Sequence, residues 1–300
     1  MSVELSILAS PSDIAFLGAT LGHQLDRAAT STVISHRVVL VDDRPSFHHG
    51  DIAALHSICG HLLDTGRVDE VRSIDWGRNV VASAMTRWFG DPATPTDAGG
   101  RARYQYLATV DSARRDRVLH LDSDMLVHGG LGTWADEAVE RLDQHRAAVA
   151  VIPNAAIPQA RRPIEWVLGR RVDRPDYPSG WTVSTDVTSR ACLLDRTRLY
   201  RMLPLRLGDA DEQWERSVTD ALERGGAESH TELGVDLMVF HPHRHNATHR
   251  RWHRELIGLV ERGRYPYRRR GHPWDITTEG RRFLPWLPAV IAQRLGDRRR

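Results

Sequence analysis

The sequence of 300 residues contains no lysine, so all 41 of its basic residues are arginine. A Walker A loop places a lysine on the nucleotide phosphates, and an enzyme that uses pyridoxal phosphate forms its Schiff base on a lysine. Protein kinases also hold the ATP phosphates with a lysine. The missing lysine therefore excludes these three classes of enzyme.

Cysteine and long apolar runs are scarce as well. Cys59 and Cys192 stand far apart and belong to no C-x-x-C pair, which argues against a structural zinc site or a disulfide framework. No stretch approaches the roughly 18 apolar residues that a membrane span needs. The opening MSVELSILAS lacks the basic n-region of a signal peptide. We therefore expect a cytoplasmic protein.

Positive and negative charges nearly balance in the whole chain, but they are unevenly distributed along it. The formal net charge is +2 at pH 7, so we expect no nucleic-acid partner. Residues 281–300 are basic and combine apolar residues and Trp286 with flanking arginines. Such a segment is typical of a C-terminal helix packed on the core, which we favour, or of an interfacial helix on anionic lipid. The second alternative would make the protein membrane-peripheral.

Apolar runs that alternate with helical patterns predict an α/β fold with a mainly parallel sheet. Ser12 with Asp13, and Asp51, are the expected caps of the first two helices, and Gly66 is the expected stop of the second. The expected strands are residues 3–10, 36–45, 69–76, 117–122, 147–154, 189–195 and 235–242. The expected helices are residues 12–28, 50–66, 79–90, 103–115 and 211–226.

Two pairs of acids follow strands of this predicted sheet, where ligands bind in such folds. Asp42 and Asp43 follow the apolar run RVVLV of the second strand, and Asp122 and Asp124 follow the run RVLHL. Because residues i and i+2 of a strand share a face, the latter two carboxylates would repel each other unless a cation lies between them. Mg²⁺ or Mn²⁺ suits that position and takes substrate phosphates as further ligands. The alternative is a pair of solvated acids at a turn.

Residues 117–136, RVLHLDSDMLVHGGLGTWAD, resemble the D-x-D segment of glycosyltransferases with the GT-A fold. The strand that leads into Asp42 and Asp43 is similar to the family's strand whose acidic end contacts the nucleoside. Residues 220–243 are similar to the family's helix–glycine–strand–histidine stretch. The resemblance implies an α/β, GT-A-like, Rossmann-type mixed sheet, mainly parallel and flanked by helices.

The same resemblance implies one domain over residues 1–300. Residues 1–130 would bind the nucleotide sugar, residues 131–250 would bind the acceptor, and residues 251–300 would form a C-terminal lid and basic helix. The implied reaction moves a sugar from a nucleotide-diphosphate sugar, first among them a UDP-sugar, to a small-molecule or glycan acceptor.

Metal ligands follow from the resemblance position by position. Asp124 would bind Mn²⁺ or Mg²⁺ directly, and Asp122 would contact the metal or the ribose of the donor. His241 would be the third protein ligand, with His243 as its alternate. A nitrogen ligand beside carboxylates favours Mn²⁺ over Mg²⁺.

Candidates for the catalytic base lie in the stretch GDADEQWERS, where the family's base often falls. Asp211, Glu212 and Glu215 could each take the proton of the acceptor. Acids also gather in the first turn of any helix because the helix dipole favours them there. Whether the transfer inverts or retains the anomeric configuration stays open.

Three histidines, His245, His249 and His253, follow at a spacing of four, which places them on one face of a helix. This segment is either a plain surface helix or a lid over the diphosphate. In the lid, Arg250 and Arg251 would pair with phosphate oxygens.

Two other functions use the same features. A metal-dependent phosphatase or nucleotidyltransferase could use Asp122 and Asp124, although the phosphatase motif D-x-D-x-T has Leu126 in place of its threonine here. A membrane-peripheral protein with a degenerate site would need neither metal nor nucleotide.

Overall fold

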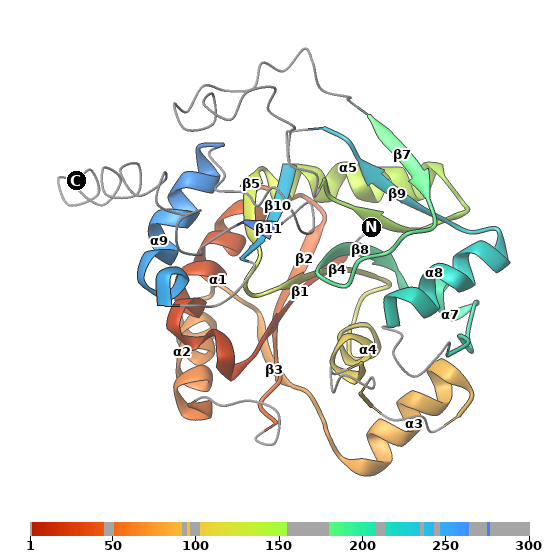
Figure 1. Cartoon of the computed structure of the whole chain (residues 1–300), viewed down its shortest axis with the longest axis horizontal. Helices are drawn as coiled ribbons and strands as arrows, with labels where there is room; N and C mark the ends of the chain where they lie inside the picture. The colour runs from red at the N-terminus through yellow and green to blue at the C-terminus, as the bar shows by residue number, and fades with distance from the viewer. Residues whose placement is uncertain are drawn as a thin grey trace.

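The computed structural model describes residues 2–44, 51–91, 95–96, 103–154, 180–207, 214–234, 237–242, 247–263 and 275–276. A large sheet has the strand order β3-β2-β1-β4-β8-β6-β9-β7, and a small one has the order β11-β10-β5 (Figure 1). The strands are β1 Val3–Ala9, β2 Ile34–Val41, β3 Glu70–Ser73, β4 Arg117–Asp122, β5 Leu126–Gly129, β6 Ala148–Ile152, β7 Trp181–Ser184, β8 Ala191–Asp195, β9 Glu228–Glu232, β10 Leu237–Pro242 and β11 Asp275–Ile276.

Helices surround the large sheet. They are the 3-10 turn η1 Pro11–Asp13 and the α-helices α1 Ile14–Ala28, α2 Ile52–Asp64, α3 Arg78–Phe89, α4 Tyr104–Asp111, α5 Leu131–Gln144, α7 Arg196–Tyr200, α8 Trp214–Gly225 and α9 Ala247–Glu261. Within the described ranges, none of these helices has the length and apolar character of a membrane span.

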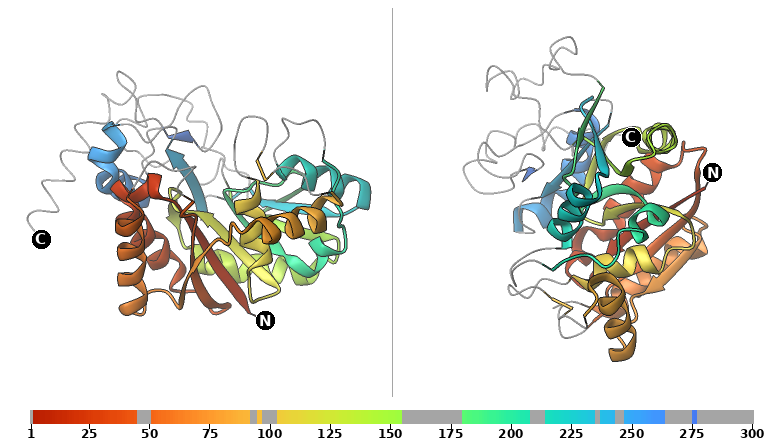
Figure 2. Two further views of the ribbon diagram at one scale, coloured as in Figure 1. Left: turned by 90° about the horizontal axis from the view of Figure 1, so that it is seen from below. Right: turned by 90° about the vertical axis from the view of Figure 1, so that its right-hand side faces the viewer.

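The first four strands in the sheet order, β3, β2, β1 and β4, pair in parallel. Every residue of β1, VELSILA, is buried, because helices cover both faces of a parallel sheet. On one face, β1 and β2 pack against α1, α2 and α5. On the other face, Leu8 and Leu40 pack against α3, α4 and α8. Figure 2 shows these helices on the two sides of the sheet.

The sheet becomes mixed at β8, which runs antiparallel to both β4 and β6. β6 and β9 are parallel, and β7 is antiparallel to β9. Four of the seven neighbouring pairs are therefore parallel. This arrangement confirms the predicted mixed, mainly parallel α/β sheet flanked by helices.

Helix α2 begins and ends as the sequence predicts. The Asp51 carboxylate accepts a hydrogen bond of 3.0 Å from the backbone N–H of Ala54, as an N-cap does. The helix ends at Asp64, and Gly66 then adopts a left-handed conformation with φ of +66°, which costs glycine little.

The start of α1 differs from the prediction. A 3-10 turn over Pro11–Asp13 comes first, and Ser10 is its N-cap. The Asp13 carboxylate accepts hydrogen bonds from the backbone N–H and the hydroxyl of Ser10, at 3.1 and 3.0 Å. Asp13 is the N-cap residue of α1, as predicted, but its side chain bonds back to Ser10 and not to the first turn of α1, and Ser12 lies within the 3-10 turn.

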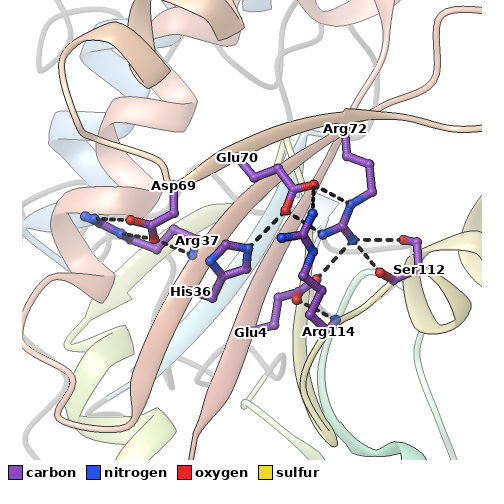
Figure 3. A network of polar contacts seen from close by, with 8 residues as sticks. All are labelled: Glu4, His36, Arg37, Asp69, Glu70, Arg72, Ser112 and Arg114. Atoms are coloured by element: carbon purple, nitrogen blue, oxygen red, sulfur yellow. Dashed lines mark hydrogen bonds and ion pairs between the residues drawn. The ribbon is translucent and has the colours of Figure 1, made fainter.

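A buried acid in β1 organises the polar contacts beside the sheet. Glu4 is fully buried, and its carboxylate accepts hydrogen bonds from Arg72 at 3.3 Å and from the Arg114 backbone N–H at 2.7 Å (Figure 3). Arg72 also donates to both carboxylate oxygens of Glu70, at 3.0 and 2.8 Å. His36 and Arg114 contact Glu70 at 3.1 and 2.9 Å. Glu70 therefore joins three cationic or titratable side chains.

Hydrogen bonds from Arg72 outweigh burial and lower the pKa of Glu70 from 4.5 to about 2. Since the folded-state pKa lies below the unfolded one, this ionised carboxylate stabilises the fold above pH 4.5, and the stabilisation is lost as the pH falls toward 2. The contribution of Glu70 to stability is thus expected to depend on pH in the acid range.

We expect Glu70→Gln to lower the free energy of unfolding by about 1–2 kcal/mol at pH 7, because the amide does not keep two charge-assisted bonds to Arg72. The difference from the wild-type protein should shrink between pH 4.5 and 2. Urea unfolding at several pH values measures it. Glu137→Gln, a change at an exposed position of α5, is the matched control. Equal effects of the two changes would contradict the prediction.

Candidate active site

Four parallel strands bring their carboxyl ends to one edge of the large sheet. Asp42 and Asp43 follow β2, and Asp122 ends β4 two places along the sheet. β8 runs the opposite way, so Arg190, just before it, lies at the same edge. The Asp122 backbone N–H donates to the Arg190 carbonyl at 2.9 Å. This edge therefore gathers three acids and one arginine.

The D-x-D turn is anchored by α1 and by the turn before it. The Ser123 hydroxyl donates to the Asp13 carboxylate at 2.8 Å, and the Ser123 N–H donates to the Leu8 carbonyl at 2.9 Å. The amide nitrogen of buried Gln24 donates to the carbonyls of Asp122 and Met125, at 2.9 and 2.8 Å. Three chain segments thus fix the backbone that carries Asp122 and Asp124.

Three side chains surround the Asp122 carboxylate. His120 Nε2 lies 3.2 Å from one carboxylate oxygen. The Tyr106 hydroxyl and the Arg190 guanidinium both donate to the other, at 3.5 Å. Burial lowers the pKa of Arg190, but the carboxylates of Asp122 and Asp124 more than compensate and hold it above its ordinary value. Burial and the charge of Asp122 raise the pKa of Tyr106. Tyr106 and Arg190 therefore both donate to the Asp122 carboxylate.

Asp124 contacts His241 across the small sheet. β5 begins two residues after Asp124 and pairs antiparallel with β10, so that Leu126 lies opposite Phe240. This register puts His241 beside the D-x-D turn, and His241 Nε2 lies 2.9 Å from a carboxylate oxygen of Asp124. The structure therefore brings together two of the metal ligands that the resemblance implies.

The Asp124–His241 pair fits a divalent cation. Neighbouring ligands of an octahedral ion at 2.0–2.1 Å lie about 3 Å apart, which matches the separation of these two donor atoms. A carboxylate with an imidazole is a donor set that suits Mn²⁺. No group of three candidate ligands lies close enough together among the described residues. An ion here would take its other ligands from water and from phosphate oxygens, as Mg²⁺ and Mn²⁺ sites commonly do.

The two acids after β2 have different partners. Buried Asp42 accepts a hydrogen bond of 2.9 Å from the indole N–H of Trp76. The Arg44 guanidinium lies over the Trp76 ring, 3.7 Å from its centroid. Asp43 instead contacts His56 at 3.0 Å and accepts a hydrogen bond of 3.0 Å from the hydroxyl of Ser73. Asp42 therefore belongs to an aromatic and cationic cluster, and Asp43 to the contact between α2 and β3.

Glu215 lies in the first turn of α8 and binds the chain just before β8. It accepts hydrogen bonds from the backbone N–H and the hydroxyl of Ser189, at 2.6 and 2.5 Å. Ser189 precedes Arg190, so Glu215 supports the segment that reaches Asp122. Its role as a base stays a prediction. Asp211, Glu212 and His243 lie outside the described residues.

The expected histidine stripe is a helix, but it is not a plain surface helix. His249 in α9 is fully buried, and its ring centroid lies 4.7 Å from that of Phe16 in α1. His253 is half-buried, and His245 lies outside the described residues. Arg250 and Arg251 are exposed on the same helix, with Arg251 over the Trp252 ring at 5.0 Å. This face of α9 therefore packs against α1 at His249.

Sequence reasoning missed four side chains of this edge, namely Tyr106, His120, Arg190 and Trp76. Trp76 ends a predicted strand, at residues 69–76, so its position at a strand end could have singled it out. Arg190 precedes its strand, and it reaches the edge only because β8 runs antiparallel to β4. The residues of a strand do not reveal whether it runs parallel or antiparallel to its neighbour.

No protein-family model matches the chain, and no curated protein matches it. Among solved structures, the chain is similar to the crystal structure of GalNAc-T7 with UDP, GalNAc and Mn²⁺, with a TM-score of 0.50 and 9% identity, over 81% of this chain and 44% of that one. It thus spans less than half the length of GalNAc-T7. This similarity confirms the predicted GT-A-like fold, and at such low identity it shows the fold alone.

Two further solved structures match less closely. A mycobacterial protein matches with a TM-score of 0.45 and 13% identity, over 86% of this chain and 73% of its own. CMP:2-keto-3-deoxy-manno-octonic acid synthetase complexed with CTP matches with a TM-score of 0.41 and 11% identity, over 77% of this chain and 89% of its own.

We expect Gln24→Met to lower the free energy of unfolding by about 2 kcal/mol, because it leaves the buried carbonyls of Asp122 and Met125 without the amide donor. The thioether fills similar space, so lost packing contributes little. Chemical unfolding measures the change. The control is Gln144→Met at an exposed position at the end of α5. A Gln24→Met variant as stable as the control would show that the turn does not depend on these bonds.

Proposed function

We propose that the protein is a metal-dependent glycosyltransferase that moves a sugar from a nucleotide-diphosphate sugar to a small-molecule or glycan acceptor. The observation that carries the proposal is the approach of Asp124 and His241 to 2.9 Å at the carboxyl edge of a GT-A-like sheet. Residues 1–130 bind the donor in this proposal, and residues 131–250 bind the acceptor.

Mn²⁺ or Mg²⁺, held by Asp124 and His241 with His243 as the alternate, would act as a Lewis acid that stabilises the departing nucleoside diphosphate. Asp122, oriented by Tyr106 and Arg190, contacts the metal or the donor ribose. A carboxylate that two donors hold in place loses little freedom when the donor binds, which favours accurate placement.

The remaining roles follow from position. Asp42 or Asp43 contacts the nucleoside, and Trp76 beside Asp42 offers an aromatic face at the same edge. Arg190 brings positive charge to the reacting end of the donor.

Contacts to the diphosphate and to the acceptor come from the second half of the chain. Arg250 and Arg251, exposed on α9, pair with the diphosphate. Asp211, Glu212 or Glu215 accepts the proton of the acceptor. Both hydrogen bonds from Ser189 end on the same carboxylate oxygen of Glu215, so they leave a role as the base open to its other oxygen.

A UDP-sugar is the first donor to test. The structure of GalNAc-T7, which has a similar fold, holds UDP and Mn²⁺. A screen of UDP, GDP, dTDP and CDP, each with and without Mn²⁺, identifies the nucleotide through the melting temperature. A ligand present at 100 times its Kd adds about 2.7 kcal/mol to stability. We expect one nucleotide to raise the melting temperature only when Mn²⁺ is present.

Asp124→Asn and His241→Ala should each abolish the metal-dependent shift and lower sugar transfer at least about 100-fold, since each removes a metal ligand. Asp69→Asn, which loses an exposed ion pair with Arg37, is the control and should behave as the wild type. Sugar transfer by the Asp124→Asn variant at the wild-type rate would contradict the proposal.

The released product separates the alternatives. A transferase releases a nucleoside diphosphate, a nucleotidyltransferase releases pyrophosphate, and a phosphatase releases orthophosphate. If no nucleotide changes the melting temperature and the protein binds liposomes through residues 281–300, the non-enzymatic, membrane-peripheral alternative is favoured instead.

A further inference from the structure

A groove rich in arginine lies at the edge of the large sheet opposite the candidate active site. It has a volume of about 670 Å³ and is bordered by the start of β4, the end of β8 and the chain just before β6. β1 starts at the same edge, which the N-terminus marks in Figure 2. The lining residues are Ser2, Arg114, Arg115, Asp116, Arg117, Arg146, Asp195, Thr197, Arg198 and Arg201.

Three of the six arginines already have partners and form the walls of the groove. Arg117 makes an ion pair with Asp143. Arg198 lies 3.2 Å from the Asp195 carboxylate and also donates to the carbonyls of His145 and Ala148. Arg114 contacts Glu70 at 2.9 Å. Each of these three guanidinium groups therefore already has a carboxylate beside it.

The other three arginines, Arg115, Arg146 and Arg201, are exposed. They come from three separate segments, and the described part of the chain supplies no carboxylate partner to any of the three guanidinium groups. Asp116 is the only lining acid besides Asp195, whose carboxylate already faces Arg198. Like charges gathered in one concave space repel each other, so an anion that enters the groove is favoured electrostatically.

Guanidinium groups bind phosphate through two parallel N–H donors, so three arginines in the lining of one groove suit a ligand with more than one phosphate group. The hydroxyl groups of Ser2 and Thr197 add donors to the same lining. The volume lies within the range of about 300–1,000 Å³ that is usual for small-molecule sites. A concave site of this size suits a discrete ligand better than the flat surface of a bilayer.

The groove is separate from the site of the proposed transfer. Arg117 begins β4 and Asp122 ends it, so about 17 Å of strand lies between the two. We propose that the groove is a second binding site, which holds a small polyanion with two or more phosphate groups, either free in solution or as the headgroup of a lipid. This inference does not rest on the proposed function.

Calorimetric titration with inorganic tripolyphosphate, in EDTA to remove divalent cations, tests the site. The triple variant Arg115→Ser, Arg146→Ser and Arg201→Ser should weaken binding at least about tenfold, because it removes three charge-assisted contacts. The control triple Arg78→Ser, Arg224→Ser and Arg254→Ser removes the same charge at exposed positions elsewhere and should change the Kd less than about twofold. Circular dichroism verifies that both variants fold.

Asp124→Asn should bind tripolyphosphate as the wild type does, because it lies at the other edge of the sheet, so this result is independent of the proposed transfer. Vesicles that contain phosphatidylinositol bisphosphate distinguish a lipid headgroup from a soluble ligand. If the protein binds these vesicles and the triple variant Arg115→Ser, Arg146→Ser and Arg201→Ser does not, the ligand is a headgroup. If the protein binds tripolyphosphate but not the vesicles, the ligand is a soluble polyanion. Absence of binding to both probes, or an equal loss of binding in the two triple variants, would overturn the inference.

Discussion

The antiparallel pairing of β5 with β10 determines where the candidate active site can form. Leu126 lies opposite Phe240 in this pair, and the register carries His241 to 2.9 Å from Asp124. A slip of one residue would turn His241 to the other face of the strand. Helix α9 secures the arrangement through α1, because His23 accepts a hydrogen bond of 2.9 Å from the Val127 N–H and contacts Glu261 at 3.0 Å. The D-x-D turn and the histidine thus belong to one packed unit.

The two carboxylates of the D-x-D turn are preorganised by the surrounding chain. Two carboxylates two positions apart raise each other's energy, and the surrounding chain offsets this with the donors of Tyr106 and Arg190 and with the anchored backbone of the turn. Because the groups that anchor the turn are buried and come from β1, the 3-10 turn and α1, the acids are already placed before any ligand arrives. Such rigidity is what the proposed binding of a metal and a diphosphate at this edge requires.

The acids at strand ends could be predicted, because apolar runs identify the strands and parallel strands end at one edge. His241 was reached only through the family resemblance, since no local pattern links it to Asp124. Arg190 could not be predicted, because its place depends on the antiparallel direction of β8. β9, with the polar sequence ESHTE, was missed because it has no apolar period, yet Ser229 and His230 are fully buried. His230 lies 2.7 Å from Arg141 and 2.9 Å from Glu228, so polar partners take the place of an apolar face.

A crystal structure with Mn²⁺ and the nucleoside diphosphate that binds best would show whether Asp124 and His241 bind the metal. Anomalous scattering at the manganese edge locates the ion without reference to the chain. We predict one Mn²⁺ bound to the Asp124 carboxylate and the His241 imidazole, at about 2.1–2.2 Å, with diphosphate oxygens completing its coordination. A structure in which the nucleotide is bound, the Asp124–His241 ion pair is intact and manganese lies elsewhere would contradict the account.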